Sequence, residues 1–391
     1  MMTYISLSFE VHQPYRLNRG FPYQGGEYFD EKLNRSTFNK ISEKCYHPAT
    51  DTILDRLDEY KNEFKVSFSV SGVFLEQCEM YDPDLIELFK NLAETKNVEF
   101  LCQTYYHSLS SLYEDKDEFI EQVKMHRAAV RDMIGYEPTF FENSELLYNN
   151  EIAELVKSLG FKGIFIEGIS RILGWRSPNY VYEQKNMPVL LRNYQLTDDI
   201  GFRFSSREWE EYPLTADKYA AWVAAARGDC INIFMDYETL GEHHWADTGI
   251  FEFLGYLPEE ILKYDHLSFL TPSEIVEACD PVGEIDVGVF DTISWADLER
   301  DTSCWLGNEM QIACYEKLKR MEEKVKKTGD RELLETWRRL GISDHLYYLF
   351  TAGGGPGEVH SYFSPYNSPI DAFVIYYSVL SDFERRIDLS Q

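Results

Sequence analysis

The sequence predicts an α/β protein, a parallel β/α barrel or a distorted relative of one, with a helical carboxyl-terminal region packed on it. Short apolar runs alternate with helical segments about seven times as far as Met235. Polar side chains follow several of these runs directly. Beyond Trp245 the alternation stops and long helical stretches replace it. We therefore expect a catalytic barrel over residues 1–270 and a helical region over 271–391 that completes the site.

The expected strands are short runs rich in β-branched and aromatic residues. The first one must end before Pro14, because proline cannot continue a central strand, so His12 and Gln13 should lie where the strand becomes a loop. In chain order, the expected strands are Thr3–Phe9, Phe64–Val70, Val98–Cys102, Thr139–Phe141, Lys162–Ile166, Val189–Leu191 and Ile231–Met235.

The expected helices have apolar residues at helical spacing, and Gly160 and Gly228 stop two of them. The segment from Tyr15 to Asn39 contains several glycines and a proline, and we expect a long loop there. The glycine-rich run at 352–357 can only be a loop. The expected helices are Asp51–Lys61, Pro83–Thr95, Glu114–Ile134, Asn149–Leu159, Thr215–Arg227, Phe251–Tyr264, Pro272–Cys279, Asp297–Thr328, Asp330–Phe350 and Pro369–Arg386.

Composition narrows the class of function. The chain has 391 residues, of which 44% are hydrophobic, so it can bury a sizeable core. Its formal net charge of −29 repels phosphate groups, and we expect neither nucleic acid nor an anionic membrane as a partner. Aromatic residues make up 15% of the chain, which suits sugar stacking, although core packing is their commoner use.

Several features indicate a cytoplasmic protein without a bound cofactor. The seven cysteines are scattered and form no CxxC pair, which fits reduced thiols. The amino terminus lacks the basic and apolar regions of a secretory signal, and no apolar run approaches the ~20 residues of a membrane helix. The chain contains no dinucleotide fingerprint, phosphate-binding loop or GxSxG elbow.

Two carboxylates stand out because each directly follows an apolar run: Glu167 and Asp236. In a parallel barrel this position is the rim on which catalytic groups sit. Pairs of carboxylates catalyse glycoside hydrolysis, in which one protonates the leaving oxygen and the other attacks the anomeric carbon or activates water. A single acidic residue after a strand is more often a helix cap or a surface group, so the pair carries the argument.

Imidazoles, acids and an indole follow Asp236 in close succession. Glu238, Glu242, His243 and Trp245 belong to this cluster, and His12 and His107 also fall at strand ends. A zinc site is the rival interpretation. However, the chain has no HExxH motif, and adjacent residues on an extended segment point apart. We therefore expect no metal, and we expect His12, Gln13, His107, Glu242 and His243 to bind sugar hydroxyls.

A second polar and aromatic group, Ser294–Asp301, precedes a predicted helix. Trp295 could stack on a sugar ring. Asp297 is equally well explained as a substrate-binding residue or as the N-cap of the helix.

Taken together, these motifs resemble glycoside hydrolase family 57, and within it the archaeal α-amylase-like members. His12-Gln13-Pro14 is similar to the first conserved region of the family. Four further regions follow in the family's order, and they are matched by Val98–His107, Gly163–Gly168, Phe234–His243 and Ser294–Asp301.

The resemblance implies a distorted (β/α)7 barrel, an α-1,4-glucan substrate and retention of anomeric configuration. It implies Glu167 as the nucleophile and Asp236 as the general acid/base. Hydrolysis of the kind catalysed by α-amylases is the expected reaction, and a 4-α-glucanotransferase would use the same residues. Two alternatives of another class remain: a metal-dependent polysaccharide deacetylase and a non-catalytic glucan-binding protein.

Overall fold

Seven parallel strands form a closed barrel in the computed structural model, which describes residues 2–352 and 364–390. Around the barrel they follow the order β3-β2-β1-β8-β7-β5-β4. Cys102, directly after β3, exchanges backbone hydrogen bonds with Phe140 and Glu142 and closes the ring. The strands are β1 (Thr3–Val11), β2 (Val66–Val70), β3 (Val98–Leu101), β4 (Phe141–Glu142), β5 (Ile164–Glu167), β7 (Met187–Arg192) and β8 (Cys230–Asp236).

This architecture confirms the predicted α/β class and the (β/α)7 barrel. Two short strands that the sequence did not predict lie beside it. β6 (Tyr182–Gln184) pairs antiparallel with β7, and β9 (Leu267–Phe269) pairs parallel with the start of β1.

The alternation of side chains along each strand decides which residues reach the inside of the barrel. On β1, Leu7 and Phe9 belong to the core between the strands and the surrounding helices, so Ser8 and Glu10 face inward. The Ser8 hydroxyl lies 2.7 Å from that of Ser67 on β2, within the barrel. By the same alternation, the inward positions at the carboxyl ends of β5 and β8 are Glu167 and Asp236.

Helices surround the barrel, and side-chain caps fix the beginnings of several. Ser71, Asn149 and Asn193 each accept a hydrogen bond from a backbone N–H in the first turn of the helix that follows. The helices are α3 (His47–Tyr60), α4 (Gly72–Tyr81), α5 (Pro83–Glu94), α6 (Asp117–Ala129), α7 (Asn150–Ser158), α8 (Ser170–Leu173), α9 (Tyr194–Gly201), α10 (Ala216–Ala225), α11 (Ile250–Leu262) and α12 (Pro272–Ala278).

The prediction of a long loop between Tyr15 and Asn39 was wrong. The segment contains α1 (Phe21–Gln24) and α2 (Glu31–Ile41). Asp30 caps α2 by accepting a hydrogen bond from the Leu33 N–H, and Phe38 and Ile41 anchor the helix in the core. The glycines and the proline that suggested a loop lie before this cap.

Two long carboxyl-terminal helices were also predicted wrongly. Residues 297–302 are irregular, α13 (Ser303–Leu306) is short, and α14 (Glu309–Thr328) starts only after Asn308, which forms a capping box with Gln311. The helix expected over Asp330–Phe350 ends early, because α15 (Arg331–Leu340) stops at Gly341 and α16 (Asp344–Tyr347) follows. The last helix is α18 (Pro369–Ser390), and the loop predicted at 352–357 lies almost entirely outside the described residues.

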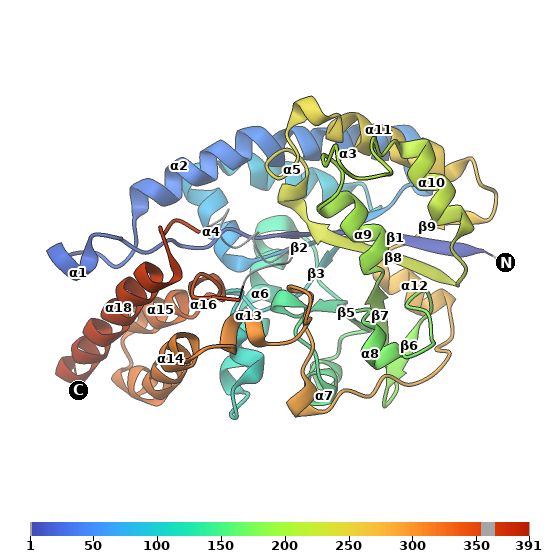
Figure 1. Cartoon of the computed structure of the whole chain (residues 1–391). Helices are drawn as coiled ribbons and strands as arrows, with labels where there is room; N and C mark the ends of the chain where they lie inside the picture. The colour runs from blue at the N-terminus through green and yellow to red at the C-terminus, as the bar shows by residue number, and fades with distance from the viewer. Residues whose placement is uncertain (1, 353–363, 391) are drawn as a thin grey trace.

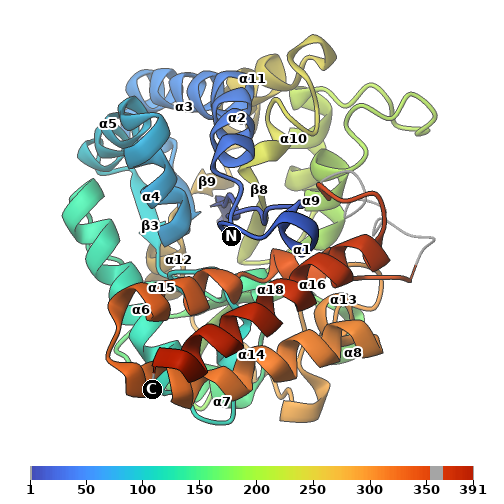
Figure 2. The same ribbon diagram turned by 90° about the vertical axis from the view of Figure 1, so that its left-hand side faces the viewer.

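The carboxyl-terminal helices pack in a second core, to which Leu318, Trp337 and Leu380 contribute together with Leu17 and Leu147 from the amino-terminal half of the chain. In Figure 1, α14, α15 and α18 lie together on the side toward which β1 runs, which is where the parallel strands end. Figure 2 looks from that side and shows the same three helices packed side by side in front. Among the described residues, no helix combines the length and apolar character needed to cross a bilayer.

A buried ion-pair cluster joins this helical region to the barrel. Glu118 on α6 is fully buried and accepts hydrogen bonds from Arg338 Nε at 2.8 Å and from Arg338 Nη2 at 3.2 Å. Lys326 Nζ on α14 lies 3.0 Å from the same carboxylate. Removing Glu118 would leave the buried Arg338 with the half-exposed Glu121 as partner and Lys326 with Glu322, and the Arg338 guanidinium would lose both of its bonds to a buried carboxylate.

We predict that Glu118→Ala lowers the free energy of unfolding by about 3–5 kcal/mol, because it leaves the Arg338 charge without its main partner. The double variant Glu118→Leu/Arg338→Met should recover much of this loss, since it removes both charges. Urea-induced unfolding followed by circular dichroism measures both effects. Glu323→Ala breaks an exposed ion pair with Lys327 on α14 and serves as the control. A loss of stability no larger than that of the control would contradict this account.

Candidate active site

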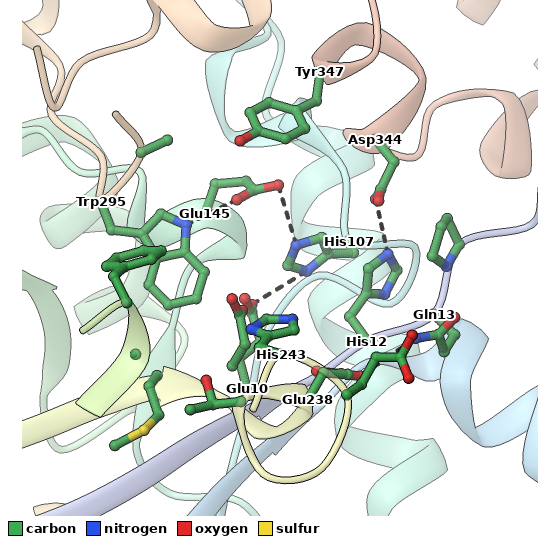
Figure 3. A pocket seen from close by; sticks show the side chains of 18 of the residues that line it. Glu10, His12, Gln13, His107, Glu145, Glu238, His243, Trp295, Asp344 and Tyr347 are labelled. Carbon is green, nitrogen blue, oxygen red and sulfur yellow. Dashed lines mark hydrogen bonds and ion pairs between the residues drawn. The ribbon is translucent and has the colours of Figure 1, made fainter. Parts of the chain in front are cut away.

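A cavity of about 230 Å³ opens at the carboxyl ends of the barrel strands. Glu10 on β1 and Asp236 on β8 line it from the barrel, and Trp295, Asp344 and Tyr347 line it from the carboxyl-terminal region. Figure 3 shows Glu10 on the opposite side of the cavity from Tyr347. The cavity is therefore built by two parts of the chain that are far apart in sequence.

All but one of the site residues that the sequence predicted line this cavity. The exception is Glu167, whose side chain is 0% exposed. The residues that line the cavity are His12, Gln13, His107, Asp236, Glu242, His243, Trp295 and Asp297.

Glu167 is enclosed in a cluster of ion pairs. Its carboxylate accepts hydrogen bonds from Arg192 Nη1 at 2.9 Å and from Arg300 Nη1 at 2.6 Å, and the backbone N–H of Gly168 donates to it at 2.7 Å. Both arginines also bind Asp198, at 2.8 and 3.2 Å. Glu167 is therefore fully buried and is not among the residues that line the cavity.

Glu145 is the carboxylate that the sequence argument missed. It lies three residues beyond β4, whereas the argument considered only acids directly after a strand. The backbone adopts left-handed conformations at Glu145 (φ 62°) and Leu146 (φ 49°), a strained arrangement that clusters at functional sites. This turn brings the Glu145 side chain to the cavity, where it is 15% exposed.

Both carboxylate oxygens of Glu145 have partners. Trp295 Nε1 donates to Oε2 at 2.9 Å, and the Ser343 hydroxyl donates to Oε1 at 2.9 Å. His107 Nε2 lies 3.5 Å from Oε1. Figure 3 shows Glu145 between Trp295 and His107, pointing into the cavity. These contacts fix the orientation of the carboxylate at the cavity.

Asp236 is the last residue of β8 and lines the same cavity. Burial raises its pKa to about 6, and the negative charge of Glu145 adds to this effect. The charges of Arg192 and His107 oppose the rise. A carboxyl group with such a pKa can hold a proton near neutral pH, which is the requirement for a general acid.

Further acidic residues crowd the floor of the cavity. Burial and the charge of Asp236 raise the pKa of Glu238 to about 8, while Tyr46 and Gln13 donate hydrogen bonds to its Oε1 at 2.5 and 3.4 Å. Burial and the charge of Glu142 raise the pKa of Glu10 well above its usual range. Glu238 therefore holds a proton near neutral pH.

His12 and His107 stack on each other and form one wall of the cavity, with ring centroids 4.2 Å apart. His12 Nδ1 lies 2.7 Å from the Ser71 hydroxyl, and its Nε2 lies 3.1 Å from Asp344 Oδ2. Burial acts to lower the pKa of His107, but hydrogen bonding to Glu145 and the charge of Glu145 outweigh burial and raise it. In Figure 3, His107 bridges Glu145 and Glu10.

Of the polar residues that follow Asp236, Glu242 and His243 line the cavity and His244 does not. Glu242 Oε1 accepts a hydrogen bond from Lys40 at 2.6 Å, and Oε2 lies 3.4 Å from Lys44. Burial lowers the pKa of His243 to about 3, so its ring is neutral. His244 lies 2.8 Å from both the Ser205 hydroxyl and the Ile200 carbonyl oxygen.

Asp297 also has a clearer position than the sequence allowed. It begins no helix, since the next helix, α13, starts only at Ser303. The N-cap interpretation of Asp297 was therefore wrong. Its backbone is left-handed, with φ 54°, and the residue lines the cavity, as does Trp295 two positions earlier in the sequence.

No group of three or more histidine, cysteine, aspartate or glutamate residues that could hold a metal ion occurs in the described part of the chain. The deacetylase alternative requires an aspartate and two histidines to converge on a metal. The described residues give it no such site.

Comparison with known proteins adds independent information. The sequence model of glycosyl hydrolase family 57 matches residues 6–288. A protein of Methanocaldococcus jannaschii described as "Putative alpha-amylase" is 51% identical over 393 residues, which cover 97% of this chain and 84% of that protein.

Solved structures share the fold. A family 57 branching enzyme from Thermococcus kodakaraensis aligns with a TM-score of 0.72 at 16% identity, over 98% of this chain and 90% of that enzyme. A 4-alpha-glucanotransferase from Thermococcus litoralis aligns with a TM-score of 0.65 at 17% identity, over 88% of this chain and 56% of that enzyme. At these identities the likeness concerns the fold alone, whereas the match to the family extends over most of the chain. The chain therefore belongs to glycosyl hydrolase family 57 and is a glycoside hydrolase.

Proposed function

We propose that the protein hydrolyses α-1,4-glucans with retention of configuration, with Asp236 as general acid/base and Glu145 as nucleophile. One observation carries the assignment: Asp236 and Glu145 are carboxylates of the same cavity, and the charge of Glu145 raises the pKa of Asp236. Glu167, which the family resemblance suggested as the nucleophile, is enclosed by arginines instead.

The two carboxyl groups have environments that suit different roles. Donors from Trp295 and Ser343 hold both oxygens of the Glu145 carboxylate in a fixed orientation, as a nucleophile requires. Burial favours the protonated form of Asp236, as a general acid requires. Pairs of titratable groups with contrasting environments are the usual basis for assigning acid and nucleophile.

The reaction then follows a double displacement. Asp236 protonates the glycosidic oxygen while the Glu145 carboxylate attacks the anomeric carbon, so that the bond to the leaving sugar breaks and a glycosyl ester forms. Asp236, now ionised, takes a proton from a water molecule, which attacks the ester and releases Glu145. For this mechanism the two carboxyl groups work about 5–5.5 Å apart.

The choice of α-glucan rests on the family and on the relative described as an alpha-amylase. Transfer to a second sugar in place of water is the alternative, and it is favoured by the fold shared with a 4-alpha-glucanotransferase. The same residues would act, and only the acceptor would differ. A non-catalytic glucan-binding protein would not need the paired carboxyl environments.

Glu167 has a positioning role in this proposal. It holds Arg300, and through it the irregular segment 296–301 that carries Asp297 to the cavity. We also propose that residues 271–391 act as the region that completes the site, because Ser343 and Trp295 orient Glu145 from there. The seven cysteines are all free, and this supports a reducing compartment such as the cytoplasm.

We predict that the purified protein converts maltoheptaose into shorter maltooligosaccharides only, as resolved by chromatography of the products. Glu145→Gln and Asp236→Asn should each abolish turnover, because each removes a group that acts on the scissile bond, while both variants should still bind the sugar. Products both longer and shorter than maltoheptaose would indicate the transferase instead. Full activity in Glu145→Gln would contradict the nucleophile assignment.

The pH dependence of kcat/KM should report on Asp236. A general acid must be protonated, and its raised pKa extends the protonated form up to about pH 6. We therefore expect kcat/KM for maltoheptaose, whose leaving sugar oxygen needs a proton, to fall about tenfold per pH unit above this value.

With α-maltosyl fluoride, whose leaving fluoride needs no proton, the same alkaline limb should be absent. An identical limb with both substrates would show that the limb does not arise from protonation of the leaving group by Asp236.

A further inference from the structure

We propose that the protein has a second binding site, for a neutral oligosaccharide, in a cavity between α9 and α10 that nothing in the catalytic mechanism uses. Only the choice of an α-glucan as the oligosaccharide rests on the proposed function.

The cavity has a volume of about 470 Å³, which is within the range of small-molecule sites. Asn193 and Gln195 line it from the start of α9, and Trp222 and Ala226 line it from the end of α10. Trp209 belongs to the loop that joins the two helices and lines the cavity as well. Figure 1 shows α9 and α10 as neighbours on the opposite side of the molecule from α14 and α18.

Helix α9 separates this cavity from the active site. Tyr194 and Asp198, one turn apart, contact the active-site arginines: Tyr194 stacks against Arg300 at 4.3 Å, and Asp198 binds both Arg192 and Arg300. Gln195 and Asp199, also one turn apart, line the second cavity instead. The two cavities therefore share a helix, and no described residue lines both.

Two tryptophans give the second cavity its aromatic surface. The rings of Trp209 and Trp222 lie 6.0 Å apart at an angle of 74°, and both residues are only half-buried. An edge-to-face pair that remains partly exposed offers apolar ring surface to a ligand. Such a surface suits the C–H face of a pyranose ring, because the C–H groups can pack on the indole rings while the sugar hydroxyls stay in contact with water.

Amide groups supply the polar contacts. Asn193 Nδ2 donates to Asn179 Oδ1 at 2.8 Å, which fixes both side chains at the cavity. Asn179 Nδ2 also donates to the Arg227 carbonyl oxygen at 3.2 Å, and Asn193 Oδ1 accepts from the Leu196 N–H at 3.1 Å. Each amide keeps one further N–H, and Gln195 is exposed. Side chains that both donate and accept match sugar hydroxyls, which do the same.

The charges at this cavity are balanced internally, which argues for a neutral ligand. Asp199 pairs with Arg203, and Glu211 Oε2 lies 2.6 Å from Lys218 Nζ. The Lys218 ammonium also lies 5.4 Å from the centre of the Trp222 ring, where a cationic ligand would otherwise be attracted. Among the residues that line the cavity, the acids thus already have cationic partners and no cation is available for an anion.

The test uses the full-length Asp236→Asn variant with ¹⁵N-labelled tryptophan, so that added sugar is not hydrolysed. On titration with maltoheptaose, the indole resonances of Trp209 and Trp222 should shift, in addition to that of Trp295, which reports on the active site. Adding Ala226→Phe fills the second cavity without removing a core side chain. It should weaken the binding seen at Trp209 at least about tenfold and leave the Trp295 response unchanged.

Trp175→Ala, which removes a fully exposed tryptophan outside both cavities, is the matched control and should alter neither response. Trp209 and Trp222 resonances that stay unmoved while Trp295 saturates would overturn the second site. A response at Trp209 without one at Trp295 would instead count against the proposed function and leave the second site standing. Cellohexaose, a β-linked probe, separates α-glucan preference from general sugar binding.

Discussion

Crowding of carboxyl groups at one end of a closed barrel is the constraint on which this site depends. The carboxyl ends of β1, β4 and β8 put Glu10, Glu142 and Asp236 at the same end of the barrel, and Glu238 follows directly. Like charges that close, in a buried setting, cannot all ionise. Burial raises the pKa of Asp236, and the charges of Glu145 and Asp344 add to this effect, so Asp236 can carry the proton that a general acid needs.

The charges of the two arginines near this cluster, Arg192 and Arg300, are neutralised by nearby carboxylates. Arg192 acts to lower the pKa of Asp236, and Arg300 lies close to Arg192, at the Glu167 carboxylate. Glu167 and Asp198 bind both guanidinium groups and compensate their charge, so that Asp236 can remain a proton donor. Glu167 thus supports catalysis indirectly, by neutralising the arginines. The helical region supports it by orienting Glu145 through Ser343 and Trp295.

The sequence predicted the barrel well, because short apolar runs that alternate with helical segments can be recognised in a single sequence. Eight of the site residues that it predicted line the cavity, among them His12 and Asp236 at the ends of β1 and β8. Glu145 escaped, because its position depends on a left-handed turn of non-glycine residues that no local pattern reveals. Asp297 and the true start of α14 were misplaced, because a segment of helical composition was pulled into an irregular conformation by the contacts of Arg300 with Glu167 and Asp198.

The central claim is that Glu145, and not Glu167, forms the covalent intermediate. A fluorinated maltosyl fluoride that forms the glycosyl ester quickly and hydrolyses slowly would trap this state, and peptide mass spectrometry would locate the label. The account predicts a single label on Glu145, within residues 141–150. A label on Glu167 would contradict the account, and so would inversion of configuration with no labelled peptide.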